Sequence, residues 1–251
     1  MTGAMVLAGL DKVGSEFFNG PILRRMLPGI ITEAMRNTIV YTAFAFIAGI
    51  ALGLLLALGR ISKRRRLRWP AAVFIDVVRG LPALLVIIVI GTGFPIAYRG
   101  VTGGYWRWPL GGFGSKYLPG CFALSLVAAA YMAESIRAGI EAVPRGQMEA
   151  ARSLGMSHSR AMRKVILPQA FRIIVAPLTN ELAALFKDTS LIAILGVVTG
   201  GREILQYART FQGTFSNTTP LVAGGIAYLV ITVPLLQLVA HLDRRAKSGT
   251  R

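Results

Sequence analysis

The chain has 251 residues, of which 54% are hydrophobic and 16% charged, and its mean hydropathy is +0.58. These values exclude an ordinary soluble domain and predict a single transmembrane domain over residues 1–251. The net charge is +17, but the basic residues occur in short segments between apolar runs and not in one contiguous patch, which argues against a nucleic-acid partner.

The N-terminal segment, residues 1–36, is expected to lie outside the cytoplasm. It does not resemble a cleavable signal peptide, because Asp11 and Glu16 interrupt it and no apolar core precedes Pro21. Residues 17–31 are expected to form a helix on the outer membrane surface. The first span, 37–58, is uncharged for 22 residues and must itself direct insertion.

Further apolar segments follow the first span. A helix needs about 20 apolar residues to cross about 30 Å of hydrocarbon. We therefore predict an all-α, integral membrane bundle of about five transmembrane helices plus a short cytoplasmic helix. The segment 189–201 has only 13 residues, so we expect a short helix, a re-entrant segment or a tilted extension of the preceding span, with six full spans as the alternative. The four later spans are expected at 80–98, 117–136, 165–186 and 220–242.

The distribution of Lys and Arg sets the expected sidedness. Segments 60–68 and 137–164 carry six each, and the tail after Asp243 carries four. The three segments on the opposite side carry four, three and three. The denser side is expected to be cytoplasmic in a cell membrane, with the N-terminus outside and the C-terminus inside. Trp106 and Trp108, in the external loop, are expected to anchor it at the membrane interface.

The cytoplasmic loop 139–165 contains a charged, Ala-rich helix signal. Pro144 and Gly146 should break the preceding helix, which places Glu149 in the first turn of a new one, where its charge complements the helix dipole. Ala150 and Ala151 favour the helix and let a partner approach its backbone closely. From these residues alone the loop is either a plain connection or a docking element.

The end of this loop is also predicted from single residues. Gly155 can adopt the left-handed conformation that terminates a helix. Pro168, after Leu167, can occupy the first turn of the next membrane helix without losing a hydrogen bond.

At this point a resemblance becomes specific. The pattern EAA, three residues, Gly, nine residues, Val, one residue, Leu-Pro resembles the EAA motif of permease subunits of type I ABC importers. The flanks AESIRAGIEAVPRGQMEAARSLGM, VILPQAFRIIVAPLTNE and FKDTSL resemble the polar amino acid uptake class. The resemblance covers roughly 27–245 and is strongest over 131–192. The motif residues here are Glu149, Ala150, Ala151, Gly155, Val165, Leu167 and Pro168.

The resemblance implies a set of partners. Two permease subunits, identical or related, would form the path for a polar amino acid. A cytoplasmic ABC ATPase dimer would bind the EAA loops, and an extracytoplasmic substrate-binding protein would deliver the substrate. No cofactor is expected in this chain, since ATP would be bound by the ATPase subunits. The chain itself shows no Gly-rich phosphate loop and no catalytic set, so it is not expected to be an enzyme.

Candidate substrate-path residues lie around the end of the fourth span. Ionisable groups at membrane depth are costly and tend to face a cavity or a partner, and the resemblance places Asn180 and Glu181 near the path. Either they serve the substrate or they make a structural bond within the bundle. The run Lys187, Asp188, Thr189 and Ser190 either contributes to the cavity or shapes the turn that follows.

Other polar residues suggest structural pairs. Asp76 with Arg79 and Glu134 with Arg137 have the i,i+3 spacing of helical ion pairs. The segment RGLPALLV, with Gly80 and Pro82 marking a distortion, resembles a family RGTP-type motif but has fewer polar residues. That departure is compatible with a heterodimer whose other permease supplies the missing groups.

Two alternatives concern function and substrate. A stand-alone secondary transporter or channel would need internal repeats and more spans than this chain offers. Glutamate or another acidic amino acid is the preferred substrate, from the basic balance and Lys187. His158 and His241 are isolated and predict no metal site, and the single cysteine, Cys121, excludes an intrachain disulfide.

Overall fold

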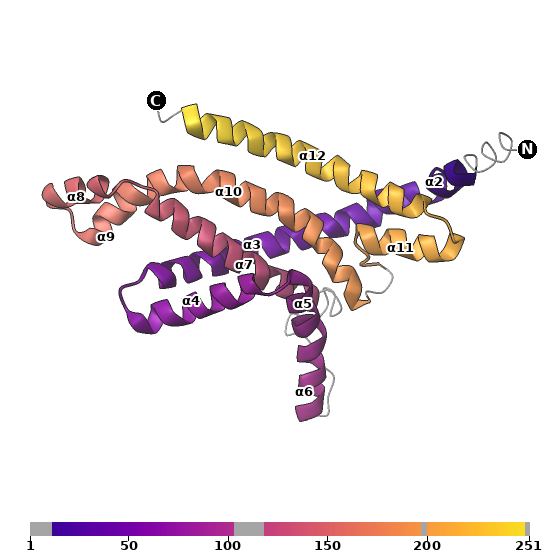
Figure 1. Ribbon diagram of the computed structural model, residues 1–251, viewed down its shortest axis with the longest axis horizontal. Coiled ribbons are helices and arrows are strands. Elements are labelled where there is room, and N and C mark those ends of the chain that lie inside the picture. Colours follow the sequence, from indigo (N-terminus) through magenta and orange to yellow (C-terminus); the bar gives the residue numbers. More distant parts are fainter. Residues whose placement is uncertain (1–11, 103–117, 197–199, 249–251) are drawn as a thin grey trace, which may run out of the picture.

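The computed structural model describes residues 12–102, 118–196 and 200–248, and within these ranges it contains helices and no strand (Figure 1). The expected interface anchors Trp106 and Trp108 lie outside the described residues. The N-terminal half consists of α2 (Gly20–Gly29), a π-helical turn η1 (Ile30–Met35), α3 (Arg36–Ile61), α4 (Arg65–Gly80), α5 (Ala83–Ile88), η2 (Val89–Gly93) and α6 (Phe94–Thr102).

The C-terminal half contains the longest helices. The 3-10 segment η4 continues from α10 and ends at Gly196, which has a φ of 67°. The segment predicted at 189–201 therefore begins as a short helix. The elements are α7 (Leu118–Glu141), α8 (Arg145–Ser153), α9 (His158–Ala161), η3 (Met162–Ile166), α10 (Leu167–Asp188), η4 (Thr189–Leu195), α11 (Ile204–Phe215) and α12 (Thr219–Ser248).

The membrane spans agree with the all-α bundle predicted from the sequence. Among the described residues, four helical stretches are long and apolar enough to cross a membrane: Lys12–Ile61, Ala83–Val101, Leu118–Glu141 and Thr219–His241. The predicted fourth span corresponds to α10, whose 22 residues are long enough but include Arg172, Glu181 and two charges at its end. Its polar content distinguishes α10 from the four apolar helical stretches.

The break predicted near Gly80 and Pro82 is present. Gly80 ends α4, and Pro82 precedes the first residue of α5 with an extended backbone. Because proline cannot continue the helix, the chain turns here and the second span begins at Ala83. The helix that covers the first span likewise starts earlier than predicted, since α2 and η1 lead into α3 without interruption.

Helix α7 forms the centre of the bundle. In its most apolar stretch 72% of the residues are buried, against 12–28% in the other three apolar spans, so those three leave wide apolar faces for lipid or partner subunits. Small residues bring α3 onto α7: a Cβ on Gly49 would lie 2.9 Å from the Ala128 Cβ, and one on Gly53 would lie 3.0 Å from the Ala129 carbonyl oxygen. Such close approach allows helices to associate within lipid, where no hydrophobic drive operates.

The sequence did not predict α11, which lies between the fourth and fifth predicted spans. Its buried side chains include Ile204, Tyr207 and Ala208, at helical spacing, and Ile204 and Tyr207 belong to one core cluster with Ile22 and Met26 of α2. In Figure 1 these two helices lie at one end of the molecule, with α8, α9 and the turn between α3 and α4 at the other.

Candidate functional site

Helix α8 carries the first part of the EAA motif. It begins at Arg145, directly after Pro144, and ends at Ser153. Glu149 is its fifth residue, so the prediction that Glu149 occupies the first turn is wrong; that turn contains no acidic residue. The reason is that Pro144, which fixes its own φ and favours a helix start just after it, sets the boundary earlier than Gly146 would.

The end of α8 is as predicted. Gly155 has a φ of +77°, and its amide donates to the Arg152 carbonyl at 3.0 Å. The amide of Met156 donates to the Ala151 carbonyl at 3.1 Å. These two bonds form a Schellman cap, which requires a left-handed residue and so favours glycine.

The faces of α8 differ sharply. Ala151 is buried, while Glu149 and Ala150 are exposed, and Leu154 just beyond the helix is 81% exposed. The outward side therefore presents an acid, a small residue and a large apolar side chain to the solvent. A helix of nine residues is too short to be stable alone, so its position depends on what lies beneath it.

Beneath α8 are the ends of two membrane helices. An open cavity of about 490 Å³ lies there, lined by Ile140 of α7, Met148 of α8 and Ile166 of η3 among other apolar residues, and by the charged residues Glu141 and Arg145. The Gln169 side-chain amide donates to the Gln147 oxygen at 3.3 Å, which links α8 to α10.

The remaining motif residues begin α10. Leu167 is its first residue and Pro168 lies within its first turn, as predicted. Helical structure runs without interruption from His158 through α9 and η3 to Asp188. One rod therefore connects the EAA segment with the polar residues at the other end of α10.

Those polar residues differ in exposure. Asn180 is exposed, and Glu181 is partly buried. The charges of Arg79 and Asp188 act electrostatically on the Glu181 carboxylate, and no ion pair joins the three groups within the described residues.

The run from Lys187 to Ser190 closes α10. The Thr189 hydroxyl donates to the Phe186 carbonyl at 2.7 Å, and the Ser190 hydroxyl donates to the Lys187 carbonyl at 2.6 Å. Thr189 is fully buried, whereas the Lys187 side chain is exposed. The two hydroxyls thus satisfy carbonyls at a helix end. This is the arrangement expected if Thr189 and Ser190 shape the turn after α10.

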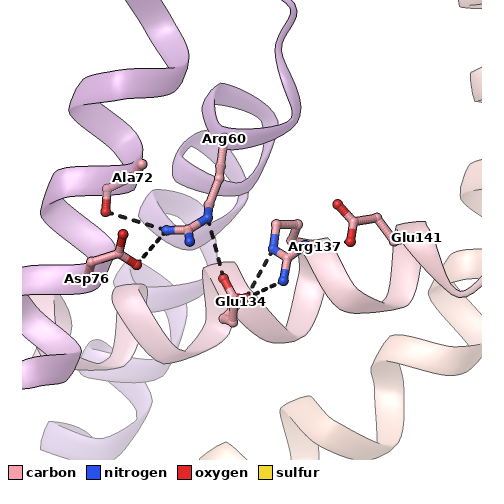
Figure 2. A network of polar contacts seen from close by, with 6 residues as sticks. All are labelled: Arg60, Ala72, Asp76, Glu134, Arg137 and Glu141. Atoms are coloured by element: carbon pink, nitrogen blue, oxygen red, sulfur yellow. Dashed lines mark hydrogen bonds and ion pairs between the residues drawn. The ribbon is translucent and has the colours of Figure 1, made fainter.

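A charge network joins α3, α4 and α7 (Figure 2). The Arg60 guanidinium lies 2.8 Å from the Asp76 carboxylate and 3.8 Å from that of Glu134. Arg137 pairs with both Glu134 and Glu141, so the predicted Glu134–Arg137 pair is confirmed.

The predicted pairing of Asp76 with Arg79 is wrong. Asp76 pairs with Arg60 across the α3–α4 turn, and the Arg79 guanidinium instead lies 5.5 Å from the centre of the Tyr131 ring. Neighbouring helices compete for a side chain, and a spacing rule for one helix does not include them.

A second polar cluster, near α11, was missed from the sequence. Glu33 binds Arg202 through two bonds of 3.1 Å and accepts the Gly200 amide at 3.2 Å. The Tyr41 hydroxyl donates to the Gly201 carbonyl at 2.8 Å. The start of α3 thereby fixes the loop before α11.

Glu203, within this second cluster, is 1% exposed. Its carboxylate accepts the amides of Leu205 and Gln206, at 2.8 and 2.6 Å, and the Tyr228 hydroxyl at 2.6 Å. Burial raises the pKa of the Glu203 carboxyl above its ordinary value, against the lowering effect of these donors. An acid directly before the apolar spacing of α11 was the available sequence signal for this N-cap.

A family model described as "binding-protein-dependent transport system inner membrane component" matches residues 49–248. Within the described residues, no group of three or more His, Cys, Asp or Glu side chains is placed to hold a metal ion.

Individual relatives point to amino acids. The chain is 34% identical over 217 residues to the probable glutamine ABC transporter permease protein GlnM of Bacillus subtilis, covering 86% of this chain and 93% of that protein. It is 32% identical over 229 residues to the glutamate/aspartate import permease protein GltK of Escherichia coli O6:H1, covering 90% and 95%.

A solved structure, the crystal structure of an amino acid ABC transporter with histidines, superposes with a TM-score of 0.75 at 31% identity, covering 88% of this chain and 95% of that one. The relatives thus share one architecture and differ in the amino acid they are named for.

Proposed function

This chain belongs to the family of binding-protein-dependent inner membrane transport components, as the non-enzymatic permease subunit of an amino-acid ABC importer, and we propose that an ATPase dimer drives it through α8. The observation that carries this proposal is the position of α8. It exposes Glu149, Ala150 and Leu154 on one side. On the other side it packs on η3, lines a cavity with Ile140 of α7, and is linked to α10 by the Gln169–Gln147 hydrogen bond.

The partners follow from that position. The exposed side of α8 fits a groove on a soluble partner, because small and apolar side chains allow close contact. Gly155 and Pro168 would fix the ends of the segment that the ATPase holds. ATP would be bound by the ATPase alone, and this chain would carry no cofactor. A second permease, identical or related, would cover the exposed apolar faces of the outer spans.

The orientation is part of the proposal. The basic segment 60–68, the loop that contains α8, and the C-terminal end of α12 lie toward the same end in Figure 1, away from the N-terminus. This gathering favours a cytoplasmic location for that end and an outer location for the N-terminus. A substrate-binding protein would then dock at the end that carries α2 and α11.

The proposed substrate path includes Asn180, Glu181, Lys187 and Asp188, and Thr189 and Ser190 shape the turn beside it. Arg79 and Lys187 favour the side-chain carboxylate of an acidic amino acid such as glutamate, while Glu181 and Asp188 would receive its ammonium group. A cationic substrate would instead use both carboxylates. Competition of labelled glutamate uptake by unlabelled glutamate, glutamine and arginine separates these cases: strongest competition by arginine would reject the acidic preference.

The test of coupling is Glu149→Lys, with Glu149→Gln as the matched control. In proteoliposomes that contain the whole importer, Glu149→Lys should lower ATP-driven uptake roughly tenfold or more, because it reverses the charge of the proposed docking surface and so its electrostatic match with the ATPase. Insertion and thermal unfolding should be unchanged, since Glu149 is exposed. Full uptake by a stably inserted Glu149→Lys variant would contradict the proposal.

A further inference from the structure

A second open cavity, of about 600 Å³, lies at the opening between α3, α4 and α7. Its size is within the range of small-molecule sites. It contains none of the residues of the proposed substrate path, and it adjoins the cavity beneath α8, with which it shares Glu141. Its polar lining consists mainly of arginines, with one aromatic residue and one acid: Arg60, Arg65, Arg68, Arg137, Trp69 and Glu141.

The charges in this cavity are not balanced. Arg60 is paired with Asp76, and Arg137 with Glu134 and Glu141 (Figure 2). Arg65 and Arg68 form no ion pair with any residue that the structure describes. Two positive charges therefore remain on one wall of the cavity.

The start of α4 increases this imbalance. Its first turn contains Arg65, Arg66 and Arg68 and no acidic residue, and its N-cap, Arg64, provides no side-chain cap. The N-terminus of a helix has a partial positive charge and free amide groups, so three arginines there are unfavourable unless an anion lies among them. The start of this 16-residue helix therefore favours a bound anion, as the lining of the cavity does.

The surroundings indicate where the anion comes from. Trp69 is 65% exposed, and Val73 and Val77, which follow it at helical spacing, are 40% and 53% exposed, so α4 presents an apolar face beside its basic start. Tryptophan with arginine at a span end is typical of the headgroup level of a bilayer, and basic pockets between membrane helices suit lipid phosphates.

We propose that this cavity binds a phosphate group, carried by the headgroup of an anionic phospholipid or by free phosphate. Arg65, Arg68 and the amides that begin α4 would surround the phosphate, and Trp69 would lie against the glycerol and acyl chains. Arg60 and Arg137, held by their carboxylate partners, would form the rear wall. The site would tie the α3–α4 turn to α7 at the membrane surface.

The test uses Trp69 as the reporter. The sequence has three tryptophans, so the double substitution Trp106→Phe with Trp108→Phe leaves Trp69 as the only one. This variant of the full chain is placed in nanodiscs with increasing fractions of brominated phosphatidylglycerol or brominated phosphatidylcholine. Brominated phosphatidylglycerol should quench Trp69 fluorescence at a lower lipid fraction than brominated phosphatidylcholine does. Arg65→Gln with Arg68→Gln should weaken its apparent affinity roughly 25-fold, about fivefold for each arginine.

Controls separate the sources and the alternatives. Arg24→Gln with Arg25→Gln removes the same charge from exposed positions on α2 and should change nothing. If inorganic phosphate in the buffer relieves the quenching by phosphatidylglycerol, the phosphate site is confirmed and is open to soluble anions; if it does not, the ligand is the lipid. Equal quenching by both lipids, or quenching unaffected by loss of Arg65 and Arg68, would overturn the proposal.

Discussion

At the scale of single residues, two buried or half-buried carboxylates have different roles. Glu203 is enclosed and accepts three hydrogen bonds from its own helix start and from Tyr228. Glu181 is only partly buried and acts with Arg79 and Asp188. A carboxylate with all its bonds inside the fold stabilises it, whereas one among charges in a membrane helix is available to a substrate.

The two glutamates can be distinguished by the same substitution. Glu181→Gln should change the KM or the selectivity of uptake severalfold and leave the melting temperature close to the parent value. Glu203→Gln replaces one acceptor by a donor facing amides, so it should cost about 1–2 kcal/mol of stability and leave the KM unchanged. Thermal unfolding in detergent and uptake kinetics are measured for both, and a Glu181→Gln variant with unaltered kinetics would remove Glu181 from the path.

At the scale of elements, packing of small residues decides how the spans meet. Gly53 of α3 faces the backbone of α7, where an added Cβ would lie 3.0 Å from the Ala129 oxygen and 3.2 Å from the Ala133 nitrogen. Backbone atoms cannot move aside as a flexible side chain can. Gly225 of α12 has no neighbour within 4 Å of such an atom.

Gly53→Ala and Gly225→Ala therefore form a matched pair. The first should force α3 and α7 apart and cost about 1–3 kcal/mol, as overpacking does. The second should be neutral or slightly stabilising, because alanine favours a helix. Thermal unfolding of the solubilised permease measures both, and equal melting temperatures for the two variants would argue against the α3–α7 contact.

The sequence predicted the elements unevenly, and the reasons are physical. The spans, the break at Pro82 and the cap at Gly155 follow from hydrophobic length and from what proline and glycine allow locally. The Arg60–Asp76 pair and the Glu33–Arg202 pair join residues distant in sequence, and only the fold brings them together. Short α11 was missed because it lies outside the span pattern.

At the scale of the whole molecule, α7 is enclosed while the outer spans are largely exposed. A single chain with such wide apolar faces is suited to assembly with a second permease and with lipid. The uninterrupted helical rod from His158 to Asp188 connects the EAA segment directly with the polar residues at the far end of α10. The central claim is that an ATPase acts at the α8 end of this rod.

The most direct measurement is a site-specific cross-link between α8 and the ATPase subunit. The only native cysteine, Cys121, is 4% exposed and is replaced by alanine. Ala150→Cys is exposed on α8, and Thr214→Cys, exposed on α11 at the opposite end, is the control. A photoreactive maleimide on position 150 should link to the ATPase, and one on position 214 should not. A link from position 214 and none from position 150 would contradict the account.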